Sequence, residues 1–140
     1  MSLVEGKNCL ITGATSGIGR STALALSEMG ANIFFIARNP QKAEELTEEI
    51  ERVSGKSPNA IIADLSSFKQ IKKAAEEYKS LNKPIDVLLN NAGIMNTERR
   101  VTEDGLEEVF AVNHLAYFLL TNLLIEKILE SGLKRVVNVS

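Results

Sequence analysis

Residues 9–20 read CLITGATSGIGR, a short apolar segment that runs into a turn with three glycines. Gly13, Gly17 and Gly19 each omit a side chain, which allows a positive φ, close approach of a ligand, or close packing of a helix on a strand. The first amides of the following helix have no helical partner and carry the positive end of its dipole, so a pyrophosphate can bind there. A glycine-rich turn without a ligand is the alternative interpretation.

The composition is typical of one globular domain. The 140 residues are 44% hydrophobic and carry a formal net charge of -2, which fits a single domain over residues 1–140 with a real core. No dense basic block indicates nucleic acid or a membrane surface, and no apolar stretch is long enough for a membrane span. A single cysteine, Cys9, gives no basis for a disulfide framework or a metal site, and it favours a reducing, cytoplasmic setting.

Short apolar runs alternate with longer segments of helical period along the whole chain. This alternation predicts an α/β fold with a Rossmann-type, doubly wound parallel sheet. Leu46 and Ile50 are expected to face that sheet from the second helix. We expect strands at residues 8–12, 32–37, 59–63, 85–90 and 135–140, and helices at 17–29, 40–54, 67–81 and 102–131.

A second informative segment ends an apolar run with Asn90-Asn91-Ala92-Gly93. Consecutive asparagines are poor strand formers, and their side chains can hydrogen-bond the neighbouring backbone. Ala92 and Gly93 leave space for a flat ligand to approach. A plain turn is the alternative, but a helical segment rather than a hairpin strand follows. We interpret this segment as one wall of a cofactor site.

Five motifs of this chain, in their order, resemble the short-chain dehydrogenase/reductase family. They are Thr12-Gly13-x3-Gly17-Ile18-Gly19, Asp64-Leu65, Asn90-Asn91-Ala92-Gly93, Val112-Asn113-His114-Leu115 and Val136-Val137-Asn138-Val139-Ser140. Residues 111–121 resemble the retinol dehydrogenase and WW-domain-oxidoreductase-like branch of that family. The resemblance implies the strand order 3-2-1-4-5, with the sheet truncated after the fifth strand.

The resemblance also implies a role for each matching residue. Asp64 and Leu65 would lie beside the adenine, and the pyrophosphate would lie over a turn made of Gly13, Thr15, Ser16, Gly17, Ile18 and Gly19. The ribose and nicotinamide would lie along Asn91, Ala92 and Gly93.

Asn113 matches the asparagine of the family's catalytic tetrad. In the family this residue marks a helix irregularity and holds an ordered water, through which protons reach the active-site lysine. From the residues alone, an asparagine in an apolar helix is more often a locally hydrogen-bonded polar group. The adjacent His114 is interpreted as a packing or surface residue.

The end of the second strand bears on the choice of cofactor. Folds that bind NAD usually place an acidic residue there for the ribose 2′-hydroxyl, whereas a basic residue accommodates a 2′-phosphate. Here Arg38 and Asn39 follow the strand, and an arginine can fork onto phosphate oxygens. We therefore predict NADP(H), with Ser16 and Asn39 as helpers and NAD(H) as the alternative. A solvated Arg38 without a ligand is the simpler interpretation.

The family moves protons with a serine and a Tyr-x3-Lys pair. Tyr78 and Tyr117 are followed four residues later by Asn82 and Thr121 rather than by lysine, and Ser140 matches only the first of two successive serines. The chain is therefore expected to be the cofactor half of an NADP(H)-dependent oxidoreductase acting on a small alcohol or carbonyl compound, and inactive alone. The alternatives are a catalytically silent nucleotide-binding module and a subunit completed by a partner chain.

The fifth strand is expected to be an uncovered edge. Its apolar side chains, Val136, Val137 and Val139, would then be exposed. Because exposed apolar edges invite pairing, we expect a homo-oligomer formed through this strand.

Overall fold

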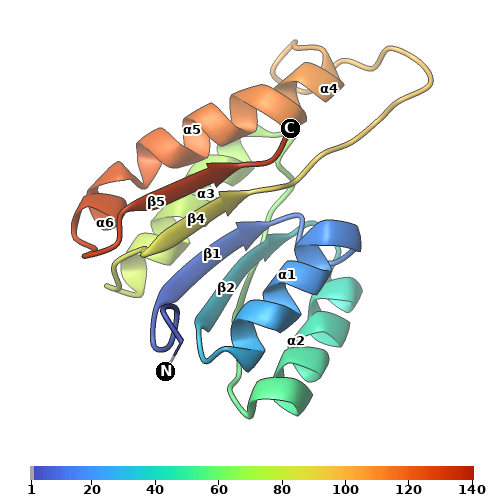
Figure 1. The fold of residues 1–140 in the computed structure, drawn as a ribbon. Coiled ribbons are helices and arrows are strands. Elements are labelled where there is room, and N and C mark those ends of the chain that lie inside the picture. Colours follow the sequence, from blue (N-terminus) through green and yellow to red (C-terminus); the bar gives the residue numbers. More distant parts are fainter. Residues whose placement is uncertain (1) are drawn as a thin grey trace.

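The computed structural model describes residues 2–140 as a parallel sheet between two layers of helices (Figure 1). Its order is β3-β2-β1-β4-β5, and every neighbouring pair is parallel, which confirms the predicted Rossmann-type topology. The order reverses between β1 and β4, the place where ligands bind in such sheets. The strands are β1 (Asn8–Thr12), β2 (Asn32–Ala37), β3 (Asn59–Ile62), β4 (Val87–Asn90) and β5 (Arg135–Asn138).

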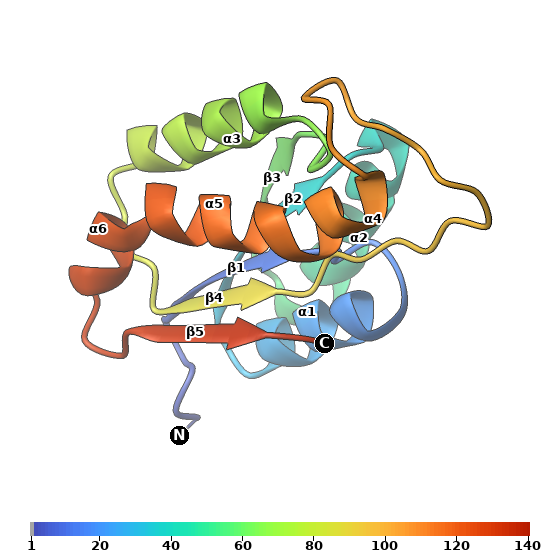
Figure 2. The same ribbon diagram turned by 90° about the horizontal axis from the view of Figure 1, so that it is seen from above.

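The helices divide between the two faces of the sheet, with α1 and α2 on one side and α3, α5 and α6 on the other (Figures 1 and 2). No helix among residues 2–140 is both long enough and apolar enough to cross a bilayer. The helices are α1 (Gly17–Glu28), α2 (Pro40–Ser54), α3 (Phe68–Ser80), α4 (Glu108–Phe110), the π-helix η1 (Ala111–Leu115), α5 (Ala116–Leu123) and α6 (Ile125–Leu129).

Alternation along the strands builds a separate core on each face. In β1, Leu10 packs with Phe34 on the α3 and α5 side, whereas Cys9 and Ile11 pack on the α1 and α2 side. Leu46 and Ile50 of α2 are buried in the second core, as predicted from their spacing. The central strands are therefore buried on both faces, and their carboxyl ends are held in a fixed arrangement.

The prediction of one helix over residues 102–131 was wrong. The helical segment begins at Glu108, and Leu124 breaks it between α5 and α6. Residues 102–106 form a turn instead, in which Gly105 has a φ of +77° and donates its N–H to the Thr102 carbonyl. The Glu107 side chain then caps the start of α4 by accepting from the next amides at 2.7 and 2.9 Å.

Candidate functional site

A cleft of about 260 Å³ opens at the carboxyl ends of β1 to β4, where the strand order reverses. Its walls come mainly from the four loops that follow these strands, with further residues from α2, α4 and η1. Nine of the residues predicted to bind the cofactor line it together: Gly13, Thr15, Ser16, Arg38, Asn39, Asp64, Leu65, Ala92 and Gly93. The fold thus brings distant parts of the sequence to one site.

The glycine turn packs tightly against the end of β4. A Cβ atom on Gly13, whose φ is +66°, would lie 2.7 Å from the Cα of Ala92. A Cβ atom on Gly19 would lie 2.0 Å from the Gly13 carbonyl oxygen. The positive φ of Gly13 and Gly17 and the close packing at Gly13 and Gly19, where a side chain has no room, are those expected of the motif. Gly17, Ile18 and Gly19 form the first turn of α1 and do not line the cleft.

The N-terminus of α1 differs from those of α2 and α3. Its N-cap, Ser16, makes no side-chain capping bond. By contrast, Asn39 accepts from Gln41 and Lys42 at the start of α2, and Ser67 accepts from Gln70 at the start of α3. The first amides of α1 therefore remain available beside the cleft, together with the positive end of the helix dipole.

Two cations line the cleft beside β2. Arg38 follows that strand, and Lys42 lies in the first turn of α2. Neither takes part in the ion pairs found among the described residues 2–140. Because Pro40 has no N–H and Asn39 occupies the next two amides, positive charge at this end comes from the two side chains.

Lys42 is absent from the sequence-based prediction. That prediction considered only the end of the second strand, where a basic residue is diagnostic. The available signal was its position one helical turn beyond Arg38, near the start of a helix expected at Pro40.

Hydrogen bonds from β1 hold the wall formed by residues 91–93. The amides of Asn91 and Ala92 both donate to the Thr12 hydroxyl at 3.0 Å, and Asn91 Nδ2 donates to the Gly13 carbonyl at 3.2 Å. Asn90 lies behind this wall, fully buried, and donates to Asn138 and Thr121. The Asn91 side chain thus makes the backbone contact expected of the pair, whereas the Asn90 side chain bonds two other side chains and joins β4 to β5 and α5.

Asn113 lies in the π-helix η1, which matches the helix irregularity that the resemblance implied. The N–H of Ala116 bonds to the carbonyl of Ala111, five residues back. Asn113 Oδ1 accepts from the Ile94 amide at 2.8 Å, and its Nδ2 donates to the Ile94 carbonyl at 2.9 Å. The side chain therefore fixes the loop after β4. Ile94 and Val112, also missed from the sequence, line the cleft.

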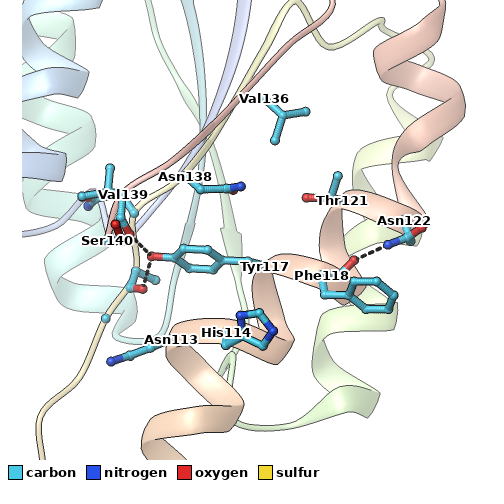
Figure 3. A pocket seen from close by; sticks show the side chains of 13 residues that line it. Asn113, His114, Tyr117, Phe118, Thr121, Asn122, Val136, Asn138, Val139 and Ser140 are labelled. Atoms are coloured by element: carbon cyan, nitrogen blue, oxygen red, sulfur yellow. Dashed lines mark hydrogen bonds between the residues drawn. The ribbon is translucent and has the colours of Figure 1, made fainter.

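A second hollow, of about 620 Å³, adjoins the cleft across Ala92 and Gly93 and lies between α5 and β5 (Figure 3). Asn91 and Asn113 line this hollow rather than the cleft. His114 is exposed on its rim and stacks on Phe110 with ring centroids 5.3 Å apart, in keeping with its interpretation as a surface residue.

Comparisons with known proteins agree with this geometry. The family model described as short chain dehydrogenase matches residues 7–140. Human retinol dehydrogenase 13 is 41% identical over 138 residues, which are 98% of this chain and 42% of that protein. The chloroplastic short-chain dehydrogenase TIC 32 B of Brassica napus is 42% identical over 140 residues, 94% of this chain and 43% of that protein. The chain therefore spans less than half the length of these relatives.

Solved structures give the same result. A metagenomic short-chain oxidoreductase in complex with NADP superposes with a TM-score of 0.85 at 26% identity, covering 98% of this chain and 63% of that one. The short chain dehydrogenase from Shigella flexneri superposes with a TM-score of 0.81 at 26% identity, covering 93% and 53%. The sheet order, the glycine turn and these matches agree, and the chain belongs to the short-chain dehydrogenase family of oxidoreductases, in its retinol-dehydrogenase-like branch.

Proposed function

We propose that residues 1–140 form the NADP(H)-binding domain of an oxidoreductase that interconverts an alcohol and a carbonyl compound. The observation that carries the proposal is a single cleft that lies beside the uncapped N-terminus of α1 and is lined by two cations, neither of which forms an ion pair with any of residues 2–140. A helix N-terminus suits a pyrophosphate, and an Arg-Lys pair suits a further phosphate. The donors of the cleft therefore match the two phosphate positions of NADPH.

Each wall of the cleft would hold one part of the cofactor. The turn of Gly13, Thr15 and Ser16 would lie at the pyrophosphate, and Arg38 with Lys42 at the 2′-phosphate, with Asn39 beside them. Leu65 and Val112 give apolar surface for the adenine near Asp64. Asn91, Ala92 and Gly93 would lie along the ribose and nicotinamide. The bound nicotinamide supplies hydride transfer, and this chain binds and orients it.

In this proposal Asn113 is a positioning residue that holds the loop after β4 in place. Both ends of its amide are engaged by the backbone of Ile94, so it holds the loop after β4 against η1. The irregular turn at η1 is the feature on which the family's ordered water depends, and we assign Asn113 to that proton path.

Neither tyrosine of this chain is placed as a proton donor. The Tyr78 hydroxyl donates to the Pro84 carbonyl, and the ring is 1% exposed. The Tyr117 hydroxyl donates to the Ala92 carbonyl, and burial raises the pKa of this tyrosine. We therefore expect the 140 residues to bind cofactor without turnover. A catalytically silent nucleotide-binding module, or a subunit completed by a partner chain, is the second candidate.

Calorimetric titration with NADPH and NADH tests the proposed cofactor. We expect NADPH to bind more tightly, because only its 2′-phosphate can pair with Arg38 and Lys42. Arg38→Ala should weaken NADPH binding about tenfold, and Lys42→Ala by a smaller factor, while NADH binding changes little.

Lys72→Ala provides the matched control, since Lys72 is an exposed lysine of α3 that does not line the cleft. Its affinity for NADPH should equal that of the wild type. Equal or tighter binding of NADH by the wild-type chain would contradict the role given to Arg38. Absence of binding to both nucleotides would overturn the proposed function.

A further inference from the structure

Tyr117 reaches from α5 to the carboxyl ends of two strands. Its hydroxyl donates to the Ala92 carbonyl, just after β4, at 2.7 Å, and lies 3.4 Å from the Val139 carbonyl, just after β5. Figure 3 shows the ring extending across the hollow from its helix toward Val139, with both contacts at the hydroxyl end. A phenol has one proton to donate, so the shorter contact to Ala92 is the principal one.

With the Tyr117 contact, both backbone polar groups of Ala92 are hydrogen-bonded to side chains. Its N–H donates to the Thr12 hydroxyl at 3.0 Å, and its carbonyl accepts from Tyr117. Thr12 belongs to β1 and is 1% exposed, whereas Tyr117 approaches from the helical layer on the other side. Ala92 is therefore fixed through both of its backbone polar groups by side chains from two different elements.

The protonation state of Tyr117 also suits a hydrogen-bond donor. Burial raises the pKa of its hydroxyl above the ordinary value, because desolvation disfavours the phenolate. The group therefore remains protonated across the physiological range and stays a hydrogen-bond donor. It also lies off the cleft itself, because Tyr117 lines only the adjoining hollow while Ala92 and Gly93 line both.

We propose that Tyr117 is a positioning residue for the nicotinamide end of the cofactor site. By holding the Ala92 carbonyl, it sets the position of the wall formed by Ala92 and Gly93. The inference rests on the proposed function, in which this wall meets the ribose and nicotinamide. The 2′-phosphate and adenine positions follow β2 and β3, and none of the Tyr117 hydrogen bonds reaches those loops.

Two probes separate the ends of the site. NADPH fills the whole site, and adenosine 2′,5′-bisphosphate fills only the adenine and 2′-phosphate end. Tyr117→Phe removes the hydroxyl and keeps the ring, so we expect NADPH to bind about three- to tenfold more weakly. Binding of the bisphosphate should be unchanged. Calorimetry on the 140-residue chain gives both affinities.

Tyr78→Phe is the matched control. It removes the other tyrosine hydroxyl, which donates to Pro84 at 3.1 Å, beyond the N-terminal end of β4 and away from the cleft. This variant should bind NADPH and the bisphosphate with the same affinities as the wild type. A general effect of losing a tyrosine hydroxyl would instead appear in both variants.

Fluorine NMR tests the inference without removing the hydroxyl. In a Tyr78→Phe background grown with 3-fluorotyrosine, Tyr117 is the single labelled tyrosine, since the chain has two. Its resonance should shift when NADPH binds and stay in place when the bisphosphate binds.

The possible outcomes are distinct. If the wild-type chain binds both probes and Tyr117→Phe weakens neither, or both equally, the inference is overturned while the proposed function stands. A fluorine shift of the same size with both probes also overturns it. If the wild type binds neither probe, the proposed function fails, and this inference with it.

Discussion

Ala92 is the residue at which the geometry of the site converges. Thr12 holds its N–H, Tyr117 holds its carbonyl, and the glycine turn approaches its Cα so closely that Gly13 has no room for a side chain. Packing alone therefore requires glycine at position 13, where the turn meets Ala92. The glycine motif predicted the turn correctly, but it could not distinguish a phosphate site from a tightly packed loop. The uncapped N-terminus of α1 and the two cations are the observations that support the proposed phosphate site.

Gly19→Ala tests the packing requirement. In an open helix this substitution stabilises, because alanine is the better helix former. Here the new Cβ would lie 2.0 Å from the Gly13 carbonyl oxygen and 2.5 Å from Asn91 Nδ2. We expect a loss of about 1–3 kcal/mol in the free energy of unfolding, as for an overpacked site, measured by urea denaturation.

The control for this substitution is Gly132→Ala. Beyond Gly132 and its two chain neighbours, no described residue has an atom within 4 Å of a Cβ built there, so the change should stay within about 0.5 kcal/mol. If the two alanine variants proved equally stable, the close contact between α1 and the glycine turn would not be a constraint in solution.

At the scale of elements, the sequence predicted best where burial is continuous. β1, β2 and α2 have the predicted bounds, because buried parallel strands are unbroken apolar runs and because Asn39-Pro40 marks a helix start. The predicted strands at 59–63, 85–90 and 135–140 lost only one or two terminal residues. Contacts between residues far apart in the sequence could not be predicted from local patterns of this kind. Tyr117 and Ala92, for example, are 25 residues apart and meet only in the folded sheet.

The wrong start of the last helical segment has a tertiary cause. Asp104 accepts from the Phe68 amide at 2.9 Å, and Glu103 pairs with the Ser67 hydroxyl. Residues expected at the start of one helix therefore cap another, α3, which lies 36 positions earlier in the chain. No local pattern could reveal this exchange. The same two bonds attach the loop that follows residues 91–93 to α3.

Asp104→Ala measures how much the cap on α3 contributes to stability. The substitution removes an acceptor from the first turn of α3 and a negative charge from the positive end of its dipole. We expect the free energy of unfolding to fall by about 1 kcal/mol, as for loss of a helix cap. Asp104→Asn keeps an acceptor and should lose less. Equal stability of the wild type and both variants in urea would show that Asp104 does not cap α3 in solution.

At the scale of the whole molecule, the sheet has two unequal edges. β3 and β5 each pair with one neighbour among the described strands. All four residues of β5 are exposed, and two successive valines, Val136 at 38% and Val137 at 41%, present apolar surface on both faces of the sheet. In β3, Ala60 and Ile62 are exposed, Ile62 at 47%, but Ile61 between them is buried. The exposure of Val136 and Val137 agrees with the expectation of an uncovered fifth strand, whereas Val139, expected to be exposed with them, is half-buried against the core on the α1 and α2 face.

We predict that the 140-residue chain self-associates through β5. A second copy can pair with the outer backbone groups of the strand and cover the valines on either face, as exposed apolar edges favour. Light scattering at high micromolar concentration should give a mass above the 15.3 kDa monomer. Val137→Lys should restore the monomer, because a charge on the edge opposes pairing. Ile62→Lys, on the opposite edge, should associate like the wild type. A wild-type chain that stays monomeric under these conditions would contradict the prediction. If Val137→Lys and Ile62→Lys were both monomeric, the association would depend on exposed apolar side chains in general rather than on β5.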